Sequence, residues 1–184
     1  MADSSAGTSM KREGLVPPGE AMYEIDTDVS ELRFRAKAFT RFWVRGTMPI
    51  AEGLVRFTDG RVSGAGQIAA DRLSTGLAPR DWHLRSSHYL HTARHARIRV
   101  SVAETPVGSP FECTVVVRGT SCTVPLTVDA VELDEGVLQV AGHLLLDRRP
   151  LPMLPPIAGV SRLVEIELEL LARRVSVDDA ESRP

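Results

Sequence analysis

The sequence is poor in aromatic residues, in cysteine and in net charge. Aromatic side chains make up 5% of the 184 residues, so an apolar cavity would have to be lined mainly by aliphatic groups. Cys113 and Cys122 are too few for a disulfide framework. We expect free thiols, with a pair facing each other across a β-hairpin as the alternative. A formal net charge of −2 gives no basic footprint for nucleic acid and no polybasic membrane patch.

Long apolar runs are also missing. No stretch approaches the roughly 18 apolar residues of a transmembrane helix, so we expect no stable membrane insertion. The opening residues MADSSAGTSMKREG lack the basic start and apolar core of a signal peptide, which favours a cytoplasmic location.

Composition divides the chain into three parts. We expect a flexible leader over residues 1–20, which are rich in Ser, Gly, Ala and Pro, and a flexible tail over 174–184, which has little to bury. One domain over 21–173 remains, without a linker that would split it.

Alternation of apolar and charged residues predicts β-strands. The clearest examples are segments 30–38, 96–102 and 164–170, where every second residue is apolar and most of those between are charged. Further strands are expected near 22–26, 42–50, 53–58, 61–72, 111–118, 121–133 and 136–147, separated by turn residues at 59–60, 108–110, 118–119 and 135–136. Strands with one apolar and one charged face favour a closed barrel with an apolar lumen, because closure removes unpaired edges.

Segment 79–90 interrupts this alternation. Pro79 suits the first turn of a helix, and Asp81 would lie favourably near the positive N-terminal end. We predict a short helix between two strands, covering one opening of the barrel.

The same region holds the residues that could carry chemistry. His83, His88, His91 and His95 crowd together, and the spacing of the last two could bind zinc on a helix. No glutamate or cysteine accompanies them and arginines surround them, so solvated histidines are favoured and no metal site is predicted. Arg80 and Asp81 with His83 could form a catalytic group. The alternative is structural: Asp81 would cap the helix and Arg80 would tie it to the barrel rim, which requires the same residue types.

Residues 73–86 carry a resemblance to a known family. The stretch LSTGLAPRDWHLRS is similar to the signature of the YceI-like family, in which Thr-Gly is followed by Arg-Asp-x-His-Leu-Arg-Ser. Weaker similarities, at Tyr23-Glu24-Ile25-Asp26 and Val124-Pro125-Leu126 among others, follow in the family's order over residues 21–173. The matching motif residues, interpreted as structural, are Thr75, Gly76, Arg80, Asp81, His83 and Leu84.

The resemblance implies an all-β fold, an eight-stranded antiparallel lipocalin-like barrel that holds a long apolar ligand, typically a polyisoprenoid or isoprenoid quinone. It also implies a homodimer, and no cofactor other than that lipid is expected. The alternation predicts that the ligand would contact the inner face, namely Leu32, Phe34, Ala36, Ile98, Val100, Val102, Val115, Val117, Ile166 and Leu168.

A non-catalytic carrier of an isoprenoid-type lipid is therefore the leading hypothesis. Two alternatives stay open. One is a small barrel enzyme that uses Arg80, Asp81 and the nearby histidines. The other is a filled barrel that acts only as a dimeric interaction module, without a ligand.

Overall fold

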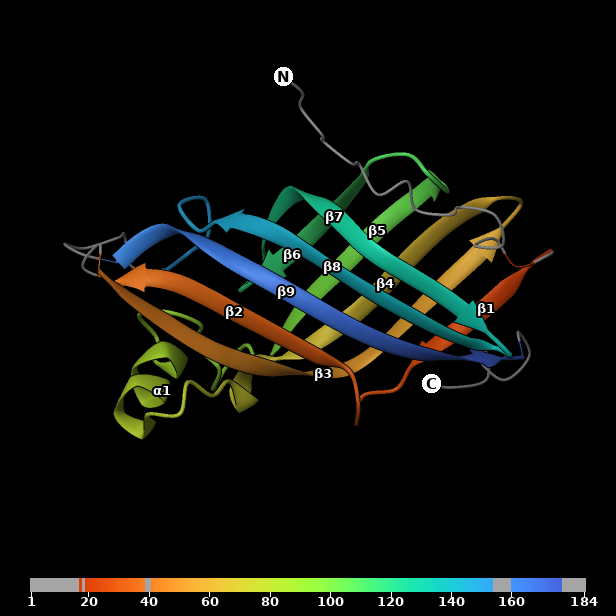
Figure 1. Cartoon of the computed structure of the whole chain (residues 1–184). Helices are drawn as coiled ribbons and strands as arrows, with labels where there is room; N and C mark the ends of the chain where they lie inside the picture. Colours follow the sequence, from red (N-terminus) through yellow and green to blue (C-terminus); the bar gives the residue numbers. More distant parts are fainter. Residues whose placement is uncertain (1–16, 18, 39–40, 154–159, 177–184) are drawn as a thin grey trace, which may run out of the picture.

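The computed structural model describes residues 17, 19–38, 41–153 and 160–176, most of which lie in strands (Figure 1). Most of the predicted leader (1–20) and tail (174–184) lies outside these described residues. In chain order the elements are β1 (Ala21–Ile25), β2 (Glu31–Ala38), β3 (Phe42–Thr58), β4 (Arg61–Ala69), a 3₁₀ turn (Ala70–Arg72), α1 (Ala78–Arg85), β5 (Arg97–Pro106), β6 (Phe111–Val117), β7 (Thr120–Asp134), β8 (Val137–Asp147) and β9 (Val160–Val175).

The strands form one closed antiparallel barrel. The order of neighbours is β1-β3-β2-β9-β8-β7-β6-β5-β4, and the additional pairs β1–β9 and β3–β4 complete the circle. β1 and β2 occupy a single position in the wall, because both pair with β3 on one side and with β9 on the other. Nine strands thus fill eight positions, and the predicted eight-stranded barrel with one short helix is confirmed.

A serine hydroxyl bridges the interruption between β1 and β2. The Oγ of Ser30 donates to the carbonyl oxygen of Leu171 over 3.2 Å and accepts from the backbone N–H of Leu171 over 3.0 Å. This side chain is buried, and it replaces the backbone groups that a continuous strand would offer to β9.

Tight turns connect three of the hairpins. The two turn residues have positive φ in each case, for example +50° at Asp59 and +74° at Gly60 between β3 and β4. Arg118-Gly119 and Glu135-Gly136 repeat this pattern. Such turns match the twist of antiparallel strands. The turns predicted at these three places are confirmed.

Several predicted boundaries are wrong. Segments 42–50 and 53–58 form one strand, β3. Its first part pairs with β2 and its last part with β1, and its pairing with β4 is irregular between Ile50 and Glu52. The strand predicted over 61–72 ends at Ala69 and continues as the 3₁₀ turn. The helix is shorter than the predicted segment 79–90, because turns replace it after Arg85.

Two separate apolar clusters lie inside the barrel. The larger one is at the end where α1 lies, where Leu73, Leu90 and Leu151 from the loops join the barrel residues Ile98 and Leu146. The smaller one, at the opposite end, consists of Tyr23, Phe57 and Leu138 with two buried alanines. Loop residues therefore plug one end of the barrel and strand residues fill the other.

One arginine holds the loops at the plugged end. Nη1 of Arg118, in the β6–β7 turn, donates to the carbonyl oxygens of Ser87, Tyr89 and Pro152. Three loops that are distant in sequence thus meet at one guanidinium group, which fixes the cover over this end.

The smaller cluster gives a direct test of the core. Leu138 is 1% exposed whereas Leu145 on the same strand is 49% exposed, on the outer face. We expect Leu138→Ala to lower the free energy of unfolding by about 2–5 kcal/mol and Leu145→Ala to change it by less than about 0.5 kcal/mol. Urea unfolding followed by circular dichroism measures both. Equal effects would contradict the assignment of Leu138 to the interior.

Candidate functional site

The strand register places all ten residues predicted for the lumen on the inner face. Leu32 lies opposite Leu168, and Phe34 opposite Ile166, across the β2–β9 pair. Val100 likewise lies opposite Val115 across β5–β6. Five of the ten are buried in the larger cluster, namely Leu32, Ile98, Val115, Val117 and Ile166. Three are partly buried against that cluster, namely Phe34, Val100 and Val102, and the two others, Ala36 and Leu168, are half-buried.

Inward side chains along the middle of the wall are only half-buried. Val100, Val102, Val128 and Leu168 all have this intermediate exposure although the barrel is closed. Leu168 and Val128 belong to neither apolar cluster. These inward side chains therefore keep part of their accessible surface outside the two apolar clusters.

The inner wall also contains residues that the sequence analysis did not select. Met48, Leu126 and Leu144 pack in or against the larger cluster. Gly64 lies opposite Val102, and a Cβ built on it would meet nothing closer than the carbonyl oxygen of Leu54 at 3.6 Å. Leu126 and Leu144 follow the alternation of apolar residues, so the sequence could have predicted them. Gly64 has no apolar side chain, so the sequence could not have predicted its place on the inner face.

The two cysteines lie on the inner face of neighbouring strands. Both are free thiols, as predicted. Cys113 lies opposite Val124, and Cys122 lies opposite Val115. The two are therefore one diagonal step apart rather than directly paired. Burial raises the pKa of the Cys113 thiol, which makes it a poor nucleophile.

The motif residues Thr75, Arg80 and Asp81 bind one another. One carboxylate oxygen of Asp81 accepts from the backbone N–H of Thr75 over 2.8 Å and from the Thr75 hydroxyl. Arg80 donates from Nε to that hydroxyl and from Nη2 to the Thr75 carbonyl oxygen, each over 2.8 Å. The hydrogen bond from Thr75 is the main cause that lowers the pKa of Asp81, and Arg85 and Arg80 add to it. This clasp fixes the segment before α1 against the helix.

The remaining motif residues and histidines do not converge on the clasp. Leu84 packs against the larger cluster, and the ring of His83 lies against Tyr89 with centroids 4.9 Å apart. His91 and His95 contact each other at 5.8 Å between centroids, and burial together with Arg118 lowers the pKa of His91. Over the described ranges of the chain, no three histidine, cysteine or carboxylate side chains gather as metal ligands.

Arginines and glutamates form a ladder on the outer face of β2 and β9. Arg33 binds Glu31 at 2.6 Å and Glu169 at 3.0 Å, and Arg35 binds Glu165 at 2.5 Å. The hydrogen bond to Glu31 is the main cause that raises the pKa of Arg33. The predicted solvated outer wall is therefore present, directly behind the apolar inner wall.

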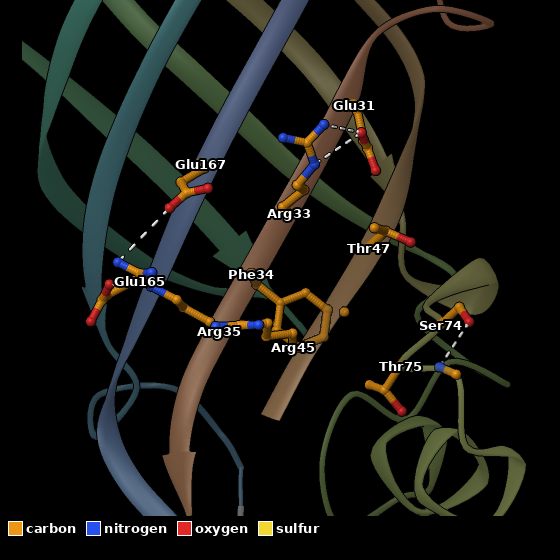
Figure 2. Close-up of a pocket in the computed structure, with 12 residues that line it drawn as sticks. Glu31, Arg33, Phe34, Arg35, Arg45, Thr47, Ser74, Thr75, Glu165 and Glu167 are labelled. Carbon is orange, nitrogen blue, oxygen red and sulfur yellow. Dashed lines mark hydrogen bonds and ion pairs between the residues drawn. The ribbon is translucent and has the colours of Figure 1, made fainter. Parts of the chain in front are cut away.

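A hollow of about 500 Å³ lies between this ladder and the segment before α1 (Figure 2). Figure 2 shows Arg35 reaching toward Glu165 on one side, while Thr47 on β3 faces Ser74 on the other. The described residues that line it are Glu31, Arg33, Phe34, Arg35, Arg45, Gly46, Thr47, Ser74, Thr75, Gly76, Glu165 and Glu167. Arg45, Thr47 and Ser74 were not predicted as site residues, since no local pattern brings β3 to a loop about 30 residues further on.

Known proteins resemble this chain in sequence and in structure. The family described as YceI-like domain matches residues 23–172. BcnA from Burkholderia cenocepacia is similar in structure, with a TM-score of 0.70 at 14% identity over 80% of this chain and 98% of that one. A polyisoprenoid binding domain from Saccharophagus degradans, implicated in plant cell wall breakdown, has a TM-score of 0.64 at 16% identity over 83% and 98%. No curated protein matches the sequence. In the part of the chain that the structure describes, no helix is both long and apolar enough to span a bilayer.

The clasp predicts a pH-dependent contribution to stability. Because the pKa of Asp81 is lowered from 3.8, its carboxylate stabilises the fold above that pH, and this contribution falls away as the pH drops further. Asp81→Asn should therefore lower Tm measurably at pH 7, and the difference from the wild type should shrink at pH 3. Calorimetry at both pH values measures it. The control is Asp134→Asn, at an exposed hairpin carboxylate. A difference that stays constant with pH would show that the Asp81 charge plays no part.

Proposed function

Because the chain belongs to the YceI-like domain family, we propose that it is a non-catalytic binding protein that carries a long apolar ligand in the barrel lumen. A polyisoprenoid or an isoprenoid quinone is the proposed ligand class. Support for the class comes from the solved neighbour from Saccharophagus degradans, which is a polyisoprenoid binding domain.

One observation carries this proposal: an apolar inner wall that is still half-exposed at mid-barrel. Val100, Val102 and Leu168 are aliphatic, point inward and are only half-buried. Moving an apolar chain from water into such a bore stabilises the complex by about 25 cal/mol for each Å² of apolar surface removed from water, before ordering costs. A polar substrate would find no hydrogen-bonding partner on these side chains.

The residues of the enzyme alternative already have structural partners. Asp81 and Arg80 are engaged by Thr75, and His83 lies against Tyr89. The polar atoms of Asp81 and Arg80 hold the segment before α1 rather than a reacting group. This favours a carrier over an enzyme. The homodimer and the cytoplasmic location stay predictions.

Native mass spectrometry of protein purified from its own host tests the proposal. We expect a discrete apolar adduct that organic extraction releases and mass analysis identifies. A clean apo mass that is unchanged after incubation with isoprenoid quinones would contradict the proposal and favour the filled barrel.

Substitutions in the lumen should abolish retention of the adduct. Val100→Arg places a charge in the bore, and Gly64→Leu fills bore space with an apolar group, so we expect each to reduce retention at least tenfold. Leu145→Arg is the control, because Leu145 is 49% exposed on the outer face, opposite Glu165. Circular dichroism confirms that each variant folds. Full retention by a folded Gly64→Leu protein would argue against a lumen site.

The inward thiols report directly on occupancy of the bore. Cys122 is the less buried of the two cysteines and faces the lumen beside Val115. A small methanethiosulfonate reagent should label Cys122 more slowly, by about tenfold, when ligand is bound. The Cys113→Ser variant isolates this reaction. Identical labelling rates with and without ligand would place the ligand elsewhere.

A further inference from the structure

Among the described residues, no strand pairs with the first half of β3 on the side away from β2. The β3–β4 pairing ends at Ile50 and Ile68. Beyond it, the segment before α1 contributes a single bridge, in which Thr47 and Ser74 exchange backbone hydrogen bonds of 2.8 and 3.0 Å. Thr47 therefore directs its backbone groups away from β2, and by alternation so does Arg45. The hollow described above adjoins this incomplete stretch of wall.

Phe34 connects the hollow to the interior. It lines the hollow and also packs against the larger apolar cluster, which no other lining residue does among those that the structure describes. Its ring tip lies 2.5 Å from the position that a Cβ on Gly46 would take, and the carbonyl oxygen of Ser74 lies 2.6 Å from the same position. The ring thus reaches across the glycine to the segment before α1. An aromatic side chain, rather than a strand, closes this part of the wall.

The hollow offers hydrogen-bond donors but little net charge. Its lining contains three arginines and three glutamates, which balance. The guanidinium groups of Arg33 and Arg35 are held by the glutamates of the outer ladder. Arg45 is exposed and has no ion pair or hydrogen bond to any described side chain. Thr47 and Ser74 also line the hollow, and the Ser74 hydroxyl accepts from the backbone N–H of Gly76 over 3.4 Å. A neutral oxygen acceptor fits this set better than an anion does, because balanced charges give an anion no net attraction.

We infer that this hollow binds the polar head of the lumen ligand, that Arg45 donates hydrogen bonds to it, and that the head is a neutral oxygen acceptor such as a quinone ring. The isoprenoid tail then passes Phe34 into the bore, so Phe34 acts as a side gate. This inference rests on the proposed function and assigns the outer end of the same ligand.

Matched probes separate the head from the tail. The probes are a naphthoquinone with a geranylgeranyl tail, the hydrocarbon phytane, and geranylgeranyl monophosphate. Dissociation constants are measured by native mass spectrometry for the wild type, Arg45→Gln and the control Arg56→Gln, which alters an exposed arginine on the same strand but outside the hollow. Both substitutions are on the surface, so the fold is retained.

We expect Arg45→Gln to weaken quinone binding about tenfold, the loss of a charge-assisted hydrogen bond, and to leave phytane binding unchanged. Arg56→Gln should affect neither probe. Equal quinone binding by the wild type and Arg45→Gln would overturn the head-group site while leaving the carrier function intact. Arg45-dependent binding of the monophosphate that is tighter than that of the quinone would show that the hollow takes an anion. If the wild type binds none of the probes, the proposed function itself fails.

The gate is tested through rates. Phe34→Ala should raise the dissociation rate of both the quinone and phytane at least fivefold, since both tails pass the ring. Leu126→Ala is the control, because Leu126 is another partly buried inner-wall residue packed against the same cluster. Equal acceleration by the two variants would mean that ligand leaves by another route.

Discussion

Closure of the hydrogen-bonded wall is the constraint on which the rest of this structure depends. A barrel without edges must pair the backbone groups of all eight positions, and deviations have to be repaired by side chains. Ser30 repairs one of them, where β1 gives way to β2 and a hydroxyl takes over hydrogen bonds to Leu171. The stretch of β3 before Thr47 is a second deviation, and there a single bridge to Ser74 takes the place of a strand.

The inner face of the wall is apolar and the outer face carries ion pairs, because side chains alternate along each strand. On β2 the inward residues Leu32 and Phe34 border the apolar interior, while Arg33 and Arg35 between them bind glutamates outside. These exposed ion pairs contribute little to stability individually. Their main consequence is that the carboxylates and the guanidinium groups of Arg33 and Arg35 beside the hollow are paired with each other. Among the described residues that line the hollow, Arg45 lies outside this ladder, and it is the cation that we propose to bind the ligand head.

Alternation made the inner face of the clearest strands predictable, because a period of two is present in the side chains themselves. It failed where pairing partners decide the outcome. The sequence predicted separate strands over 42–50 and 53–58, yet β3 continues across the break because β1 takes over from β2 as its neighbour. The hollow was not predictable for a related reason. Thr47 and Ser74 are distant in sequence and meet only in the folded barrel, and neither has a local pattern that marks a site.

The motif that is most recognisable in the sequence belongs to the support of the site. Asp81 and Arg80 hold Thr75, and Thr75 stands directly between Ser74, which forms the bridge to β3, and Gly76. All three residues line the hollow. Rigid hydrogen bonding at Thr75 therefore determines where the rim of the hollow lies relative to β3. Because Arg45 takes no part in these hydrogen bonds, they fix the rim independently of the residue that we propose to bind the ligand head.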